Sequence, residues 1–266
     1  MIYRIFSPMP ALSDVIEHYW YSNIELSQAA VQNYATPLLQ GLTFNFKKQP
    51  ERHAYDDKVV TLYKQAYFFG QPTSPRVITT NENGVDILGV KFKPLGIAKV
   101  TGINMEHMAD QFIAVEDVWG SELELLCEEM QSMPTLELAI GVLERFLWSK
   151  YLHTSLHYRI DNVQNALQLI AYSKGTMGIQ ELQCHTNTSR KTLERAFVQY
   201  LGLTPKFYSR IVRFNTVKEE LERIKNGESL TALAYQFGFY DSSHFAAEFK
   251  YFSGHTPTVY QHSLIK

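Results

Sequence analysis

Apolar residues occur in short runs along the first part of the chain and at helical spacing along the last part. Early segments rich in Val, Ile, Tyr, Phe and Thr are bounded by Gly, Pro and Asn. Such runs predict β-strands, at residues 36–46, 63–69, 75–81 and 85–93. The pair Asn83-Gly84 favours a tight hairpin turn before the last of them.

From about residue 94 the pattern changes to helical spacing. Residues 121–133 and 135–152 each carry a stripe of apolar residues, and Pro134 separates them. Ser121 and Thr135 stand where they can cap these helices. We therefore predict a small β-sandwich or half-barrel closed by a helical hairpin.

Beyond residue 158 there is almost no strand pattern. Glycines punctuate a series of helical segments, predicted at 160–173, 178–185, 189–201, 204–224, 230–237 and 242–252. The predicted fold class is α+β. A β-rich regulatory or dimerisation domain occupies residues 1–155, with helices at 121–152, and an all-α domain occupies residues 158–266.

The helical part contains an internal repeat, which is a strong guide to architecture. The segment from Leu193 (LERAFVQYLGLTPKFY) and the segment from Phe245 (FAAEFKYFSGHTPTVY) align with an offset of 52 and no gap. Seven pairs carry the match: Leu193/Phe245, Phe197/Phe249, Tyr200/Phe252, Gly202/Gly254, Thr204/Thr256, Pro205/Pro257 and Tyr208/Tyr260. The repeated unit is a short helix, a turn, a second helix, a glycine stop and a Thr-Pro restart.

Each copy has the order of a helix-turn-helix motif. In the second copy Ala234 is small enough for a close helix crossing, and Gly238 supplies the turn. In the first copy Gln183 and Asn187 take these places, and Asn is the non-glycine residue best able to enter the left-handed region. A generic helical bundle explains one copy as well as this motif does, but two copies in register are harder to explain that way.

Four short patterns then carry a family resemblance. They are S-x-x-x-L-x-R-x-F at Ser189–Phe197, G-x-T-P-x-x-Y at Gly202–Tyr208, GF-x-D-x-S-x-F-x-x-x-FK at Gly238–Lys250, and G-x-T-P at Gly254–Pro257. With them, residues 160–262 resemble the DNA-binding domain of AraC-type bacterial transcription regulators. The front half, through Tyr19-Trp20 and GVKFKPLG at Gly89–Gly96, is similar to an uncharacterised N-terminal domain fused to such regulators.

The resemblance implies a sequence-specific DNA-binding regulator with recognition helices at about 189–201 and 242–252, in successive major grooves. The connecting helix at 204–224 would span ~30 Å, close to the ~34 Å between successive major-groove faces. Candidate base contacts are Arg190, Lys191, Glu194, Arg195, Ser242, Ser243 and His244. Candidate phosphate contacts are Thr204, Lys206, Ser209, Arg210 and Lys250.

The two recognition helices differ in chemistry. The first offers long donors, suited to guanine O6 and N7, and the family pattern makes Lys191, Glu194 and Arg195 base-facing. The second offers short side chains, with Ala247 where relatives often have Arg. We expect the first helix to carry most base specificity and the second to read mainly backbone and shape.

Charge divides the chain at the same place as the pattern. Residues 1–154 carry 12 Lys and Arg against 18 Asp and Glu, and residues 155–266 carry 13 against 9. The basic back half suits an anionic partner, although an excess of four also occurs on ordinary surfaces. Two distant cysteines exclude a disulfide framework, and neither a secretory signal nor an apolar run of membrane-spanning length is visible. We expect a cytoplasmic protein without membrane attachment.

Catalytic motifs are absent. There is no Gly-rich phosphate loop, no nucleophile elbow and no H-E-x-x-H, so we predict a non-enzyme without cofactors. His153 and His157 could share a helix face, but no third metal ligand has suitable spacing. We expect Cys184 and His185 to pack locally at the turn of the first motif. We expect the glutamates of residues 121–133 to form the solvated face of an amphipathic helix.

The competing hypothesis is a small-molecule or protein receptor in which DNA binding is secondary. AraC-type regulators commonly bind effectors and dimerise through the N-terminal domain, which implies an effector in residues 1–120, a homodimer through 121–152, and RNA polymerase as partner of an activator. Front-half aromatics could line a pocket or form core: Tyr19, Trp20, Phe44, Phe46, Tyr67, Phe68 and Phe69. The dimer candidates are Leu126, Leu138, Val142 and Phe146.

Overall fold

Two antiparallel sheets form the front half of the chain. The computed structural model describes residues 2–25, 30–47, 49–55, 58–80, 84–154, 160–223 and 230–264. The larger sheet has the order β1 (Ile2–Phe6), β2 (Ile16–Ile24), β9 (Val85–Phe92), β4 (Gln40–Asn45), β7 (Ala66–Phe69) and β10 (Phe112–Ala114). The smaller sheet has the order β3 (Ala30–Tyr34), β8 (Arg76–Thr80), β5 (Glu51–Tyr55) and β6 (Lys58–Leu62).

The predicted strands correspond to β4, β7, β8 and β9, and the other six strands went unpredicted. Among the unpredicted strands, β1 and β2 pair with each other in antiparallel fashion, from Ile2 opposite Asn23 to Phe6 opposite Tyr19. β1 is an edge strand, and most of its residues are exposed although four of the five are apolar or aromatic. Asn83 of the predicted turn lies outside the described residues.

The front-half aromatics differ in burial. Tyr19, Phe44 and Phe68 are fully buried and belong to the core. Trp20, on the opposite face of its strand from Tyr19, is half-buried and lies against Gly89, where an added Cβ would come within 2.0 Å of the indole ring. Three of the seven predicted aromatics are thus core residues, and the other four are half-buried: Trp20, Phe46, Tyr67 and Phe69.

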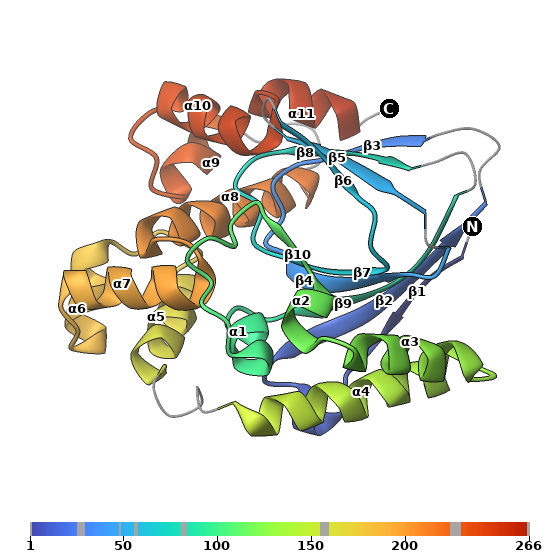
Figure 1. Cartoon of the computed structure of the whole chain (residues 1–266). Helices are drawn as coiled ribbons and strands as arrows, with labels where there is room; N and C mark the ends of the chain where they lie inside the picture. Colours follow the sequence, from blue (N-terminus) through green and yellow to red (C-terminus); the bar gives the residue numbers. More distant parts are fainter. Residues whose placement is uncertain are drawn as a thin grey trace.

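Short and long helices cover one face of the larger sheet (Figure 1). They are α1 (Gly96–Thr101), α2 (Val115–Trp119), α3 (Glu122–Ser132) and α4 (Leu136–His153), and a 3₁₀ turn spans Pro10–Leu12. Thr135 caps α4 by accepting from Leu138 N at 3.3 Å, as predicted. The predicted cap at Ser121 is wrong: its side chain makes no capping hydrogen bond, because the residue itself is helical (φ −68°, ψ −14°).

The apolar stripe of the α3–α4 hairpin faces inward. Leu126 and Val142 are buried, and the ring of Phe146 packs edge-on against Trp119 at 4.9 Å. Of the four predicted dimer contacts only Leu138 is exposed, at 51%. The stripe covers this chain's own sheet, so most of it is not available to a second copy.

The back half is helical throughout its described part. The helices are α5 (Asp161–Tyr172), α6 (Ile179–Thr186), α7 (Arg190–Leu201), α8 (Pro205–Arg223), α9 (Leu230–Gln236), α10 (Ser242–Ser253) and α11 (Pro257–Leu264). The first six lie within one residue of their predicted ends, and α11 was not predicted. Among the described residues, no helix has both the length and the hydropathy to cross a membrane.

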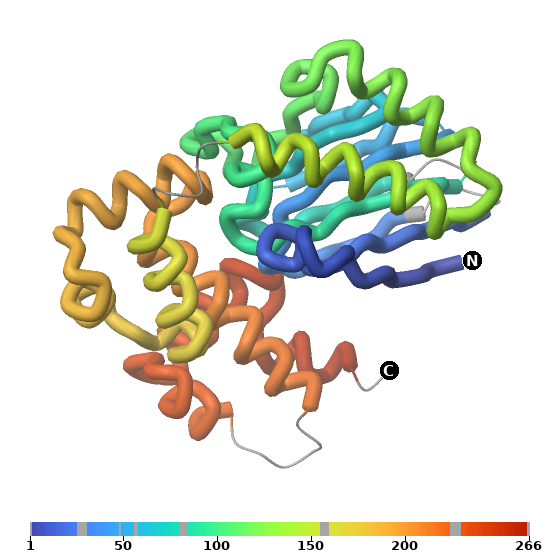
Figure 2. The backbone as a smooth tube through the Cα atoms, turned by 90° about the horizontal axis from the view of Figure 1, so that it is seen from below, coloured from blue at the N-terminus to red at the C-terminus, as the bar shows by residue number. Residues whose placement is uncertain are grey.

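The two halves are in direct contact. Lys99 Nζ of α1 lies 3.3 Å from Gln164 Oε1 of α5, and burial lowers the pKa of Lys99. Figure 2 shows the helical half lying against one end of the sheets. The front half thus touches several helices of the back half at once.

Candidate nucleic-acid interface

Each helix-turn-helix motif has a left-handed residue at its turn. In the first motif α6 ends at Asn187, whose φ is 47°. In the second motif α9 is followed by Gly238 with φ of 70°, and Phe239 N donates to Ala234 O across the turn at 3.0 Å. Glycine and asparagine enter this region at least cost, and the prediction of both turns is confirmed.

The two recognition helices, α7 and α10, begin and end alike. The side chains of Ser189 and Asp241 accept from the backbone N–H three residues on, at 3.2 Å and 2.7 Å. Each helix has 12 residues and ends at a left-handed glycine, Gly202 or Gly254. The sequence repeat is therefore a repeat of geometry, caps included.

The apolar anchors of the repeat are buried as the spacing predicts. Leu193 and Phe197 of α7 are fully buried, and Phe245 and Phe249 of α10 are almost fully buried. Ala234 is 1% exposed beneath α10. With these positions inside, the opposite faces of α7 and α10 point away from the core.

The outward face of α7 is charged. Arg190, Lys191 and Arg195 are exposed and Glu194 is half-buried. Arg190 Nε lies 2.8 Å from Glu194 Oε1, a pair four residues apart on the helix. Lys191 and Arg195 are thus the cations of this face that the Arg190–Glu194 pair does not involve.

The outward face of α10 is polar and small. Ser242, Ser243 and His244 are exposed, and Ser242 Oγ lies 3.3 Å from Thr231 Oγ1 of α9. The His244 ring packs edge-on against Phe239 at 5.5 Å and its Nδ1 lies 3.5 Å from Tyr240 N. His244 is therefore involved in the turn as well as exposed.

The predicted phosphate contacts divide into exposed and internal groups. Thr204, Lys206 and Lys250 are exposed, and Thr204 also caps α8 by accepting from Phe207 N at 3.2 Å. Ser209 is buried at 8% exposure, and Arg210 is held in an ion pair. Ser209 thus offers little surface to a phosphate, whereas Arg210 is partly exposed and is bound to Glu248.

Arg210 belongs to a partly buried ion cluster between α8 and α10. Its Nε and Nη2 each lie 2.9 Å from a Glu248 carboxylate oxygen, and Arg213 Nη2 lies 3.3 Å from the same group. Burial opposes ionisation of Glu248, but the two guanidinium groups outweigh it and hold its pKa below the ordinary value. The cluster fixes α10 on α8.

Sequence reasoning missed this cluster and two exposed tyrosines. A glutamate beside the anchor Phe249, opposite a helix rich in arginine, was the available signal for Glu248. Tyr240 and Tyr235 are 86% and 61% exposed at the second motif. The available signal for Tyr240 was its place directly before the Asp241 cap.

Comparisons with known proteins agree with this geometry. A family model described as a helix-turn-helix domain matches residues 184–263, from the end of α6 into α11. A domain of unknown function, DUF6597, matches residues 4–114. Over 94 residues the chain is 30% identical to the HTH-type transcriptional regulator ArgR of Pseudomonas aeruginosa, covering 35% of this chain and 28% of ArgR. Residues 184–263 are a helix-turn-helix domain of the AraC type of transcription regulators.

Solved structures of this type give weak overall matches. ToxT of Vibrio cholerae aligns over 100% of both chains at 11% identity and a TM-score of 0.49. Another structure of ToxT is that of the protein bound to an unsaturated fatty acid. An AraC-type protein of Chromobacterium violaceum aligns over 40% of this chain and 93% of its own, at 23% identity and a TM-score of 0.36. Scores this low do not establish a shared overall fold, and the assignment rests on the helix-turn-helix match.

AraC-type regulators are a non-enzymatic family. The sequence offers His153 and His157 as candidate metal ligands. His153 Nδ1 lies 2.6 Å from Ser149 O, and His157 lies outside the described residues. No cluster of three or more metal-ligating side chains occurs among the residues described. Of the glutamates on α3, Glu122 pairs with Lys150 at 2.6 Å on the surface.

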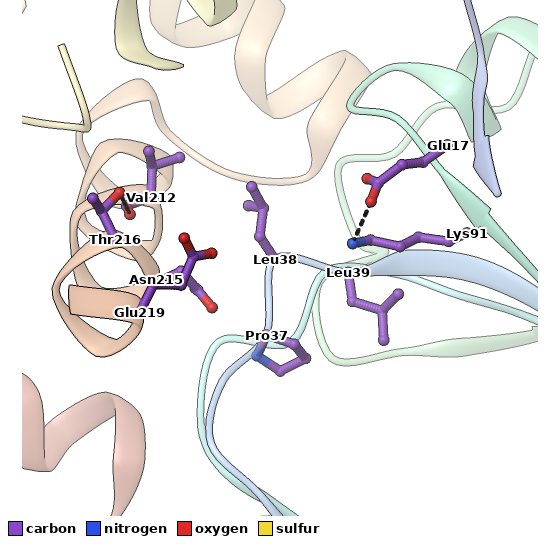
Figure 3. Close-up of a pocket in the computed structure, with 9 residues that line it drawn as sticks. All are labelled: Glu17, Pro37, Leu38, Leu39, Lys91, Val212, Asn215, Thr216 and Glu219. Carbon is purple, nitrogen blue, oxygen red and sulfur yellow. Dashed lines mark hydrogen bonds and ion pairs between the residues drawn. The ribbon is translucent and has the colours of Figure 1, made fainter. Parts of the chain in front are cut away.

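A cleft of about 340 Å³ lies at one place between the two halves of the chain, which are in direct contact elsewhere (Figure 3). Pro37, Leu38 and Leu39 line it from the front half, with the ion pair of Glu17 and Lys91 (2.8 Å) at one end. Across it lie four residues of α8: Val212, Asn215, Thr216 and Glu219. It is a contact region between the halves in which side chains do not fully pack.

Proposed function

We propose that this AraC-type regulator reads duplex DNA with α7 and α10 in successive major-groove faces of one side of the helix. The observation that carries the proposal is the pair of equally capped 12-residue helices joined through α8. α8 has 19 residues, so it spans about 28 Å, against about 34 Å for one turn of DNA. One monomer can therefore present both helices to adjacent turns.

We assign base contacts mainly to Lys191 and Arg195, with Arg190 and Glu194 beside them. Long cationic donors hold guanine bidentately, whereas serine and a locally engaged histidine do so less readily. Ser242, Ser243 and His244 are assigned to backbone and shape, and Thr204, Lys206 and Lys250 to phosphates. Ser209 is left out of the phosphate set because it is buried, and Arg210 because its guanidinium is bound to Glu248.

The front half is assigned a regulatory role. Residues 1–155 form the regulatory domain and residues 158–266 the DNA-binding domain, with a small-molecule effector bound within 1–120. A dimer contact through 121–152 would use the exposed Leu125 and Leu138 rather than the buried stripe. RNA polymerase is the partner if the protein activates, and a DNA partner places the protein in the cytoplasm.

The test uses the purified full-length chain on a library of genomic fragments at two salt concentrations. Selected fragments should bind more weakly at higher salt, because phosphate contacts release counterions. A double variant, Lys191→Ala with Arg195→Ala, should lose selection. Arg145→Ala, an exposed cation on α4 of the front half, is the matched control and should keep it.

Two results would contradict the proposal. The first is an affinity for fragments that does not change with salt. The second is selection of no fragment by a folded wild-type chain, which would favour the receptor hypothesis instead.

A further inference from the structure

The front half hydrogen-bonds to the C-terminal end of both recognition helices. Met105 N donates to Gln199 O in the last turn of α7, and Thr36 N donates to Phe252 O in the last turn of α10, each at 2.8 Å. Carbonyls in the last turn of a helix have no partner within the helix and must find one elsewhere. Two backbone N–H groups of the front half therefore complete the two recognition helices.

The two contacts fall at nearly equivalent places in the repeat. The offset of 52 sets Gln199 opposite Tyr251, one residue from Phe252. Both contacts lie at the end opposite the helix N-termini, where Lys191 and Ser243 stand. The front half can hold both helices without touching the ends assigned to DNA.

Thr36 also connects α10 to α8. It is fully buried, and its carbonyl accepts from Asn215 Nδ2 of α8 at 3.2 Å. The residues that follow, Pro37 and Leu38, line the cleft against α8 instead of packing tightly on it (Figure 3). The hydrogen bonds of Thr36 are therefore a principal connection at this point.

The front-half backbone also contacts the glycine that ends α7 in the first motif. Gly202, the left-handed cap of α7, lies against the Met105 carbonyl, where an added Cβ would come within 2.6 Å of the oxygen. Met105 itself is fully buried. The front-half backbone at Met105 is thus in direct contact with the C-terminal end of α7.

We infer that Thr36, Asn215 and Met105 are positioning residues that fix the separation and relative rotation of α7 and α10. The front half thereby sets the half-site spacing that the regulator accepts on DNA. This inference rests on the proposed function. The physical reason is that one base pair changes the separation by about 3.4 Å and the rotation by about a tenth of a turn, which a chain held at both helices cannot follow.

The experiment measures affinity against spacing. The full-length chain first selects its site from a random duplex library, and the two half-sites are then moved apart or together by one and two base pairs. Asn215→Ala removes the donor to Thr36 and keeps a good helix former in α8. Thr36→Pro removes the N–H that Phe252 O accepts, and Thr216→Val is the control, because that hydroxyl bonds only within α8 to Val212 O at 3.0 Å.

We expect the wild type and Thr216→Val to lose about tenfold or more in affinity for a shift of one base pair. Asn215→Ala and Thr36→Pro should lose about threefold or less, with near wild-type affinity at the best spacing. A variant that only weakened folding would lower affinity at every spacing equally. Circular dichroism melts check that each variant is folded.

The outcomes separate the two claims. If the wild type selects no site, the proposed function fails and this inference fails with it. If the wild type shows a sharp optimum and folded Asn215→Ala shows the same profile, the positioning role is overturned while the proposed function stands. If Thr36→Pro does not fold, Asn215→Ala alone decides.

Discussion

The two helix-turn-helix motifs have the same backbone and different attachments. In the first, α7 packs on α8 through apolar rings, with Phe197 edge-on to Tyr208 at 6.2 Å. In the second, α10 is fixed to α8 by Glu248 and two arginines as well as by Phe249, which lies 5.2 Å from Phe214. The same pattern of anchors therefore allows either an apolar or an ionic connection.

Their outward faces differ as much as their attachments. α7 presents long cations and α10 presents small polar side chains, although both helices are capped alike. The comparison teaches that the buried repeat specifies where each helix lies, and that the exposed positions decide what each helix can recognise. The predictions below separate these two roles.

The largest effect is expected from removing a shared anchor. Phe249→Ala deletes a ring that packs against Phe214, Phe245 and Tyr260, and should cost about 3–5 kcal/mol of unfolding free energy because it leaves a cavity. Urea denaturation measures it. Tyr251→Ala, half exposed on the same helix, should cost clearly less, and equal costs would argue against Phe249 as an anchor.

The ionic attachment of the second motif should depend on pH. The folded pKa of Glu248 lies below its ordinary value, so the carboxylate stabilises the fold above about pH 4.3. That contribution is lost as the pH falls through the lowered pKa. Glu248→Gln should cost about 2 kcal/mol at neutral pH and flatten the acid side of the stability profile. A profile that kept the wild-type slope would show that the cluster adds nothing.

The charged face of α7 should matter for binding and not for folding. Lys191→Ala or Arg195→Ala should each cost about 1–3 kcal/mol of binding free energy and relax preference at one base pair. Titration against the selected site and its single-base variants measures both. Thermal melts should match the wild type, since both side chains are exposed.

The face of α10 should give the smallest effect. Ser243→Ala or His244→Ala should cost less than about 1 kcal/mol and reduce affinity evenly across sequences, because short side chains seldom hold a base bidentately. The same titrations apply. Loss of base preference in these variants, with preference retained in the Lys191 and Arg195 variants, would reverse the division of labour.

The back half could be read from the sequence because local signals and core pattern agree there. Ser189, Asn187, Gly202 and Gly254 mark helix ends by their own chemistry, and the repeat confirms each by its counterpart. The capping role of Asp241 follows from the same rule. α11 was missed because its polar run, beginning at Pro257, has few apolar residues.

The front half was less predictable because its partners are distant in sequence. β1 and β2 pair with each other and β2 then pairs with β9, so the stretch near Tyr19 reads as neither clear strand nor helix. In the same way, the pairing of Arg210 depends on Glu248, 38 residues further on. Contacts such as Thr36 with Phe252 have no local signal at all.

The most direct test of the account is a selection from a random duplex library with the full-length wild type and with Lys191→Ala. The account predicts two groups of preferred bases about 10 base pairs apart. In the variant, preference should relax at one base pair of the stronger group. A single group of bases, or a pattern that the variant leaves unchanged, would contradict reading by two helices with α7 dominant.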